Sequence, residues 1–328
     1  MSPEIRSEPS DEFAESDRPA AAECFAASLR GARQAWSPRF FFPPALIALY
    51  AWLVRESLVP PEAGGTSGFA TGAAWTSFGV LAWLAGSLIA LLAAWEFGRG
   101  EALGLFEGVR LLLRRWRAVI GAPIFVALSV SVPFGLALGG ASLLRTIPAV
   151  GGPLAWIWTI LPGLPLNLLA AGFLLLGLPA MPLILVAGAV ELPYPFDAVG
   201  RGMSYVRGHP SLYLVSVAGG LLGAAFGAAC FAFLLAALVS MVGLAMGYGL
   251  EPLRRGAGAL DGSGGTLVLV AGFLLAGYAA AAIIASLARA YLLLRWKVDG
   301  EPPGSLVNPG EQFQWQEASQ GKAQGNGA

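Results

Sequence analysis

The chain has 328 residues, of which 56% are hydrophobic and only 12% are charged, and its mean hydropathy is +0.67. Soluble domains carry roughly 25% charged residues, so this composition excludes an ordinary soluble domain and indicates an integral membrane protein. The basic and acidic residues cancel to a net charge of zero, which excludes nucleic acid as a partner attracted by bulk charge.

The N-terminal segment 1–39 begins acidic and contains no apolar core, so it predicts a mostly disordered cytoplasmic tail without a cleavable signal peptide. Residues 20–36 within it are expected to form a short helix on the membrane surface. The first membrane span is expected at 40–59. The second is expected at 74–95, where two tryptophans lie about 30 Å apart along a helix, the thickness of the hydrocarbon core.

The segment that follows alternates arginines and glutamates with apolar residues at three- and four-residue spacing. This spacing predicts an amphipathic helix at 102–117, too charged to span, whose apolar face holds Leu105, Phe106, Val109, Leu112, Leu113 and Trp116. We expect this helix to lie on the cytoplasmic leaflet with its apolar face down. The third span is expected directly after it, at 118–140.

The apolar run 146–190 has four prolines in its first half. Because proline interrupts helices, we expect 148–166 to be a short broken or interfacial piece and the fourth span to occupy 168–190. The fifth and sixth spans are expected at 211–238 and 266–290. The transmembrane domain then covers 40–297, and a disordered cytoplasmic tail covers 298–328.

Six spans with both termini in the cytoplasm place 16 of the 20 basic residues inside and leave four outside: Arg55, Arg145, Arg254 and Arg255. This asymmetry follows the positive-inside rule and predicts a multi-pass protein of the bacterial inner membrane. An eight-span alternative makes hairpins of 148–190 and 211–250. It ranks second because it exports Arg201 and Arg207.

A second amphipathic helix is expected at 196–207, also lying on the cytoplasmic leaflet. Asp197 precedes Arg201 by four residues, the favourable order for a helical ion pair. The Gly-His-Pro sequence at 208–210 then breaks this helix before the fifth span. The pattern of Phe, acid, Val, arginines and an aromatic residue is shared loosely with 102–117, which suggests an internal duplication.

Three segments resemble the cytoplasmic elements of an uncharacterised family of bacterial polytopic membrane proteins, known mainly from planctomycete-type genomes: "EALGLFEGVRLLLRRWRAVIGAP", "FDAVGRGMSYVRGHPSLYL" and "YLLLRWKVDG". The second segment is also distantly similar to a motif in the membrane domains fused to bacterial glycerophosphodiester phosphodiesterases. It departs from that motif by Gly202, where serine is usual, and by Gly208 and His209 before the proline. The resemblance covers 40–300 in layout and implies architecture and location, not chemistry.

Two sets of residues are candidates for contacts. Arginines of the two amphipathic helices are expected to contact anionic lipid headgroups: Arg110, Arg114, Arg115, Arg117, Arg201 and Arg207. Glycines of the fifth span repeat every four residues and are expected to form a helix-packing face, either within the chain or with a second copy: Gly219, Gly223 and Gly227.

No sequence motif indicates an enzyme. The single histidine excludes multi-histidine metal sites, and we expect no catalytic, cofactor-binding or metal-binding residue. The interiors of the expected spans hold essentially no ionisable residue, which disfavours an ion-coupled carrier. We therefore expect an all-α membrane bundle with a non-enzymatic membrane-organising, lipid-interacting or scaffold role. The alternative is a channel or carrier for a poorly charged or lipidic solute.

Overall fold

The computed structural model describes residues 20–58, 68–191, 194–245, 263–301 and 303, and its regular secondary structure within these ranges is entirely helical. The all-α fold is therefore confirmed. The elements, in chain order, are α1 (Ala21–Gly31), the 3₁₀ turn η2 (Gln34–Trp36), α2 (Pro38–Leu58), α3 (Gly68–Arg99), α4 (Leu105–Arg114), α5 (Trp116–Arg145), α6 (Gly151–Trp158), the π turn η3 (Thr159–Gly163), α7 (Leu164–Val190), α8 (Pro195–Gly208), α9 (Pro210–Ala245) and α11 (Ser263–Asp299).

Five helical stretches in the described residues are long and apolar enough to cross a membrane: Gly72–Arg99, Trp116–Arg145, Gly151–Val190, Pro210–Val242 and Val268–Asp299. A sixth is counted if α1–η2 and α2, which meet at a bend of 76°, form one broken span. The chain is therefore a polytopic helical membrane protein. The predicted first span coincides with α2, which is counted as a span only as the second part of this bent pair.

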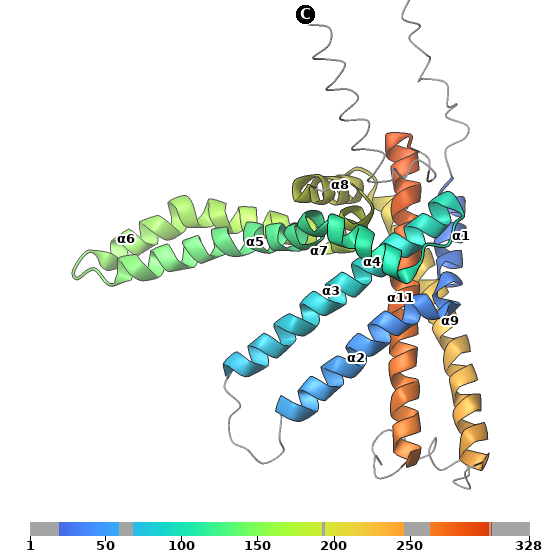
Figure 1. Ribbon diagram of the computed structural model, residues 1–328. Coiled ribbons are helices and arrows are strands. Elements are labelled where there is room, and N and C mark those ends of the chain that lie inside the picture. The colour runs from blue at the N-terminus through green and yellow to red at the C-terminus, as the bar shows by residue number, and fades with distance from the viewer. Residues whose placement is uncertain (1–19, 59–67, 192–193, 246–262, 302, 304–328) are drawn as a thin grey trace, which may run out of the picture.

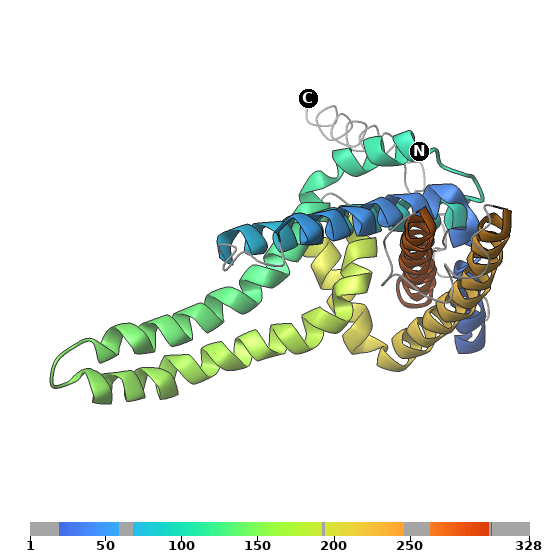
Figure 2. The ribbon, with the colours of Figure 1, turned by 90° about the horizontal axis from the view of Figure 1, so that it is seen from below.

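The long helices spread like the ribs of a fan (Figure 1). At one end α1, α4 and α8 gather around α11, and we call this the converging end. From there α9 and α11 run side by side, α2 and α3 diverge from them, and α5 and α6–α7 form a hairpin that projects sideways. The view from below shows the same separation of the hairpin from the α9–α11 pair (Figure 2).

The hairpin corrects the prediction for 148–166. Residues 151–190 form one continuous helix of 40 residues rather than a broken piece followed by a span. The π turn η3 contains Pro162, and such a turn accommodates a residue that cannot donate a backbone hydrogen bond. Pro153 lies in the first turn of α6, where backbone N–H groups have no helical partner in any case. The eight-span alternative is also wrong, because 151–190 and 210–242 are each a single helix.

The predicted tail 1–39 is helical over its described part. In α1, Cys24 and Ser28 are buried, and the helix packs against α9 and α11. The predicted boundary at residue 39 falls inside α2, which begins at Pro38. Residues 1–19 and most of the predicted tail 298–328 lie outside the described residues, while α11 itself continues to Asp299.

The glycine repeat of α9 contacts helices of the same chain. A Cβ added at Gly219 would lie 2.8 Å from the backbone oxygen of Phe25 in α1. At Gly223 it would lie even closer to the backbone oxygen of Leu29, and at Gly227 it would collide with the hydroxyl of Tyr278 in α11. These glycines thus allow α1 and α11 to approach α9 at a distance that a side chain would prevent.

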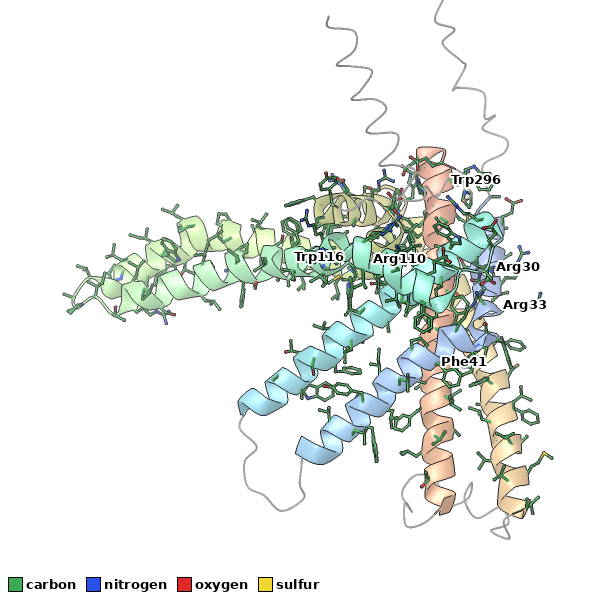
Figure 3. The ribbon with its side chains drawn as sticks, viewed as in Figure 1. Arg30, Arg33, Phe41, Arg110, Trp116 and Trp296 are labelled. Carbon is green, nitrogen blue, oxygen red and sulfur yellow. The ribbon has the colours of Figure 1, made fainter. Side chains whose placement is uncertain are left out.

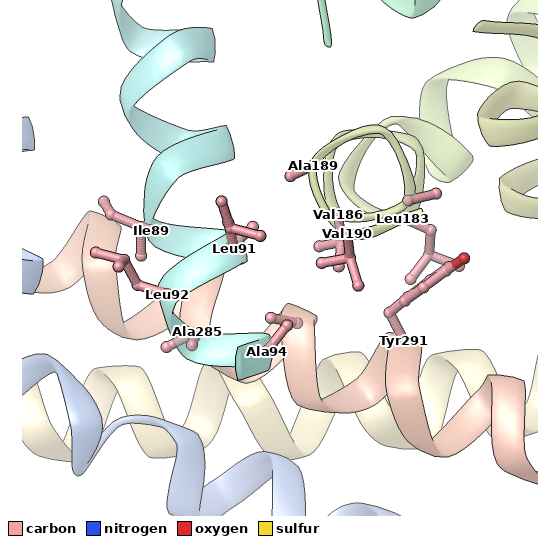
Figure 4. Packing of buried hydrophobic residues seen from close by; sticks show 14 of the residues in the cluster. Ile89, Leu91, Leu92, Ala94, Leu183, Val186, Ala189, Val190, Ala285 and Tyr291 are labelled. Atoms are coloured by element: carbon pink, nitrogen blue, oxygen red, sulfur yellow. The ribbon is translucent and has the colours of Figure 1, made fainter. Parts of the chain in front are cut away.

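The core lies at the converging end, where α3, α7 and α11 meet (Figure 4). The last turns of α3 contribute Ile89, Leu91 and Leu92, and these residues are almost completely buried. Along α11, alanines recur at the contact face, so the helices pack closely. In a membrane this packing is stabilised by dispersion contacts more than by removal of water.

Candidate functional site

Helix α4 lies across the converging end and is held there by one of its faces. Gly108, Leu111 and Leu112 are buried. A Cβ added at Gly108 would lie 2.9 Å from the side chain of Leu92 and 3.1 Å from that of Leu88, both in α3. The small glycine therefore lets α4 rest directly on α3. Of the predicted apolar face, only Leu112 is buried against the protein.

The remaining apolar residues of α4 point outward. Phe106 is 90% exposed, and Val109, Leu113 and Trp116 are also exposed. Their three- and four-residue spacing places Phe106, Val109 and Leu113 along one outer strip of α4, and the exposed Trp116 follows at the start of α5. Trp116 lies at the converging end, where the hairpin begins (Figure 3). An exposed apolar strip beside a membrane domain is typical of a helix that inserts into the membrane interface.

Three arginines accompany this strip. Arg110, Arg114 and Arg117 are exposed, and Arg110 and Arg114 directly follow Val109 and Leu113 in α4. The guanidinium of Arg117 lies over the ring of Trp116, 5.8 Å from its centroid. These three arginines are the predicted headgroup-binding residues of α4 and α5 that the structure leaves on the surface.

Arg115 points inward, so its predicted lipid contact is wrong. It is 6% exposed, and its Nη1 donates a hydrogen bond of 2.9 Å to the backbone oxygen of Ala189 in α7. The backbone leaves the helical region at Arg115 (φ −102°, ψ 13°), which turns this side chain away from its neighbours. Burial lowers its pKa to about 10, although the carboxylate of Glu191 opposes that shift, so it remains a cation at neutral pH.

Helix α8 also differs from its prediction. Val199 and Tyr205 are buried, and Gly202 lies against Ile184 of α7, so this helix packs on the protein rather than lying with an apolar face on lipid. Arg201 does not pair with Asp197; its Nη1 lies 2.5 Å from Oε2 of Glu191 and 3.9 Å from Oδ2 of Asp299. Its predicted headgroup contact is replaced by this pairing, whereas Arg207 is exposed.

Glu191, at the end of α7, is the centre of a group that we call the Glu191 cluster. Its side chain is 6% exposed. Besides Arg201, it has Nε of Arg295 at 3.2 Å and accepts a 2.6 Å hydrogen bond from the hydroxyl of Tyr291. The cluster is completed by two further contacts: Arg295 pairs with Glu301, and Tyr205 donates to Asp299.

The protonation states in the cluster are stabilised by its charges. Burial is the largest single influence on Arg201 and disfavours its cationic form, but Glu191 and the other neighbours together outweigh burial and raise the pKa of Arg201 above its ordinary value. Burial, together with the hydrogen bond to Asp299, raises the pKa of Tyr205 well above its ordinary value. Tyr205 therefore remains a neutral donor and Arg201 a cation throughout the physiological range.

Sequence reasoning missed this cluster because its residues come from α8, α11 and the end of α7, which are far apart in the sequence. One signal was present: Tyr291, Arg295 and Asp299 follow one another at four-residue spacing and therefore share a face of α11. That face also places polar groups opposite the end of α7.

A second polar group joins η2 and the start of α2 to the end of α3 and to α11. Arg39 pairs with Glu96, and its Nη1 donates a 3.1 Å hydrogen bond to the backbone oxygen of Leu103. Arg289 donates a 3.2 Å hydrogen bond to Gln34, and its guanidinium lies 4.9 Å from the ring centroid of Phe97. Both polar groups therefore tie helices together at the converging end.

These arrangements can hold helices and bind anions, and they offer no assembled site for a metal. Within the described ranges, no group of three or more His, Cys, Asp or Glu side chains could hold a metal ion. The basic groups of the Glu191 cluster face carboxylates, whereas Arg110, Arg114 and Arg117 present their cations on the surface. Of these basic groups, the arginines beside the strip of α4 are thus the ones whose cations face outward.

Comparison with known proteins gives no relative: no family model, no curated protein and no solved structure matches this chain.

Proposed function

We propose that this protein is a non-enzymatic, lipid-interacting protein of the bacterial inner membrane that binds anionic lipid headgroups through α4 and the start of α5. The observation that carries the proposal is the pairing of an exposed apolar strip with three exposed arginines on a helix whose opposite face is anchored to α3. The strip is suited to the acyl boundary, and the arginines are suited to phosphate groups at the same depth.

The same arginines favour an orientation with the converging end in the cytoplasm. The exposed arginines of α4, of the start of α5 and of α8 belong to this end, and Arg145, the last residue of α5, is the exception at the far tip of the hairpin. Basic residues are retained preferentially on the cytoplasmic side of a membrane. The cytoplasmic leaflet is also the one whose anionic lipids attract arginines.

The orientation predicts a labelling pattern. In a variant with both native cysteines replaced by alanine, Gly152→Cys at the hairpin tip should react with an impermeant maleimide in intact spheroplasts. Gly104→Cys and Gly208→Cys should react only after lysis. All three glycines lie where an added Cβ meets no atom within 4 Å, so the substitutions leave the packing intact. Labelling of Gly208→Cys from outside would reverse the proposed orientation.

Headgroup binding predicts a loss of lipid preference. Each arginine near an anionic surface contributes about 1 kcal/mol, so replacing Arg110, Arg114 and Arg117 by glutamine should reduce the preference for dioleoyl phosphatidylglycerol over dioleoyl phosphatidylcholine by roughly 100-fold. Native mass spectrometry of the full chain, with both lipids competing, measures this ratio.

Arg145→Gln serves as the matched control, because Arg145 is an exposed arginine outside the strip. It should keep the parent's ratio. An unchanged preference in the triple variant would contradict the proposed function, and an equal loss in Arg145→Gln would show that net charge, rather than α4, determines lipid choice.

A further inference from the structure

An apolar pocket of about 270 Å³ opens where α3, α7 and α11 begin to separate. Trp83 lines it from α3, Met181, Pro182 and Leu185 from α7, and Ile284 and Leu287 from α11. Almost no polar atom faces the pocket. Nearer the converging end the same three helices are packed into the core, to which they contribute Leu91, Val190 and Tyr291 (Figure 4). The pocket therefore follows from the fan: diverging helices lose contact beyond their common core.

The chemistry of an occupant follows from the position of the pocket. Its lining residues belong to three of the membrane-spanning stretches, Gly72–Arg99, Gly151–Val190 and Val268–Asp299. A water molecule needs two to four polar partners, which this lining lacks. An empty space would forfeit dispersion contacts with every wall. A hydrocarbon chain supplies those contacts, and the surrounding bilayer provides such chains at high concentration.

A hydrogen bond beside the pocket indicates where the headgroup of a lipid would lie if its hydrocarbon chain occupied the pocket. The indole N–H of Trp83 donates a 2.7 Å hydrogen bond to the backbone oxygen of Val119, in the first turns of α5. Arg117 precedes Val119 by two residues, about 3 Å along the helix axis. The wall of the pocket is thus joined directly to the segment that carries the exposed arginines.

We propose that the pocket between α3, α7 and α11 holds one acyl chain of a bound membrane lipid, whose headgroup lies at the arginines of α4 and α5. The position of the headgroup rests on the proposed function. The apolar lining of the pocket, in contrast, contacts only the acyl chain of the lipid. The lipid then bridges the hairpin and the rest of the bundle, because α7 belongs to the hairpin and α3 and α11 do not.

A filled pocket tests the proposal. Leu185→Trp places a larger apolar side chain in the pocket, and Leu178→Trp places the same side chain on the same helix at a residue that is 67% exposed. The full-length protein is purified with dioleoyl phosphatidylcholine in mild detergent, and native mass spectrometry counts the lipids retained. The parent and Leu178→Trp should retain one lipid that Leu185→Trp has lost. Retention of the same number by Leu185→Trp would overturn the proposal.

A second measurement keeps the proposal testable if Leu185→Trp does not fold. Dibrominated acyl chains quench tryptophan at contact distance, so the parent's fluorescence should fall when the retained phosphatidylcholine carries bromine, after detergent has removed loosely bound lipid. Trp83→Phe should lose most of that difference, whereas Trp75→Phe, an exposed residue on the same helix, should keep it. Equal quenching in the parent and Trp83→Phe would show that no chain reaches the pocket.

The two proposals fail independently. The variant with Arg110, Arg114 and Arg117 replaced by glutamine should lose headgroup preference but still retain a lipid of either headgroup in the pocket. Loss of the retained lipid in Leu185→Trp, together with an unchanged preference in the arginine variant, would support the acyl-chain site and reject the headgroup site. The opposite combination would reject the pocket alone.

Discussion

Replacing Glu191 by alanine is expected to destabilise the protein by about 3–5 kcal/mol, the usual cost of leaving a buried ion pair without one partner. The substitution removes the carboxylate that faces Arg201 and Arg295 and that accepts the hydroxyl of Tyr291. These groups would remain buried without their acceptor. Unfolding of the purified protein in mixed micelles with increasing SDS measures the free-energy difference.

Asp197→Ala is the matched control for Glu191→Ala. Asp197 is an exposed acid on α8, one turn from Arg201, and the structure pairs Arg201 with Glu191 and Asp299 instead. Its removal should change the free energy of unfolding by less than about 0.5 kcal/mol, as for an ordinary surface substitution. If the two variants lose similar stability, the pairing with Asp197 expected from the sequence would be the relevant one and the Glu191 cluster would not stabilise the fold.

A double substitution tests whether the contact itself matters. If Glu191 and Arg201 stabilise one another, the effect of replacing both by alanine should be smaller than the sum of the two single effects, by about 0.5–3 kcal/mol. Additive effects would show that each residue acts through other neighbours.

Gly223→Leu is expected to cost about 1–3 kcal/mol or more, because the new side chain enters a fully packed contact. The neighbouring atom is the backbone oxygen of Leu29, which cannot move without displacing α1. We therefore expect a lower midpoint of thermal unfolding in detergent, together with faster proteolysis within α1, the helix that would be displaced.

Gly172→Leu provides the comparison for this variant. Gly172 lies within α7, and an added Cβ there meets no atom within 4 Å. Because glycine is less favourable than other residues inside a helix by roughly 1 kcal/mol, this variant should be as stable as the parent or slightly more stable. If the Gly223→Leu protein had the same midpoint of thermal unfolding as the parent, α1 would not pack on α9 at this residue.

The two ends of the fan differ in what their side chains contact. At the converging end, ion pairs and small residues hold the helices together and fix α4 on the surface. Away from it, the hairpin carries a largely exposed apolar surface, with such residues as Leu143, Trp156 and Leu175 facing outward. In a bilayer this surface meets lipid. The pocket lies at the transition between these two regions.

Much of the fold could be predicted from local sequence. Helix lengths and apolar runs predicted the membrane class and a span within each of the five long apolar helices, although for Gly151–Val190 they predicted only the second half as a span. The amphipathic pattern of 102–117 predicted a surface helix close to the observed α4. The four-residue glycine repeat singled out the residues of α9 at which other helices approach most closely. These properties depend on residues within a few turns of one another, so periodicity and spacing are sufficient to find them.

The directions and partners of individual side chains were decided by the tertiary structure. Arg114 and Arg115 are adjacent in sequence, yet the first is exposed and the second donates to Ala189 in another helix. Glu191 accepts a hydrogen bond from Tyr291, which is 100 positions away in the sequence, and Tyr205 donates one to Asp299, which is 94 positions away. A local pattern cannot choose between a lipid headgroup and a buried carboxylate as the partner of an arginine. That choice depends on which helix ends the fold brings together, because a buried charge is stable only where an opposite charge or a hydrogen-bond acceptor is already in place.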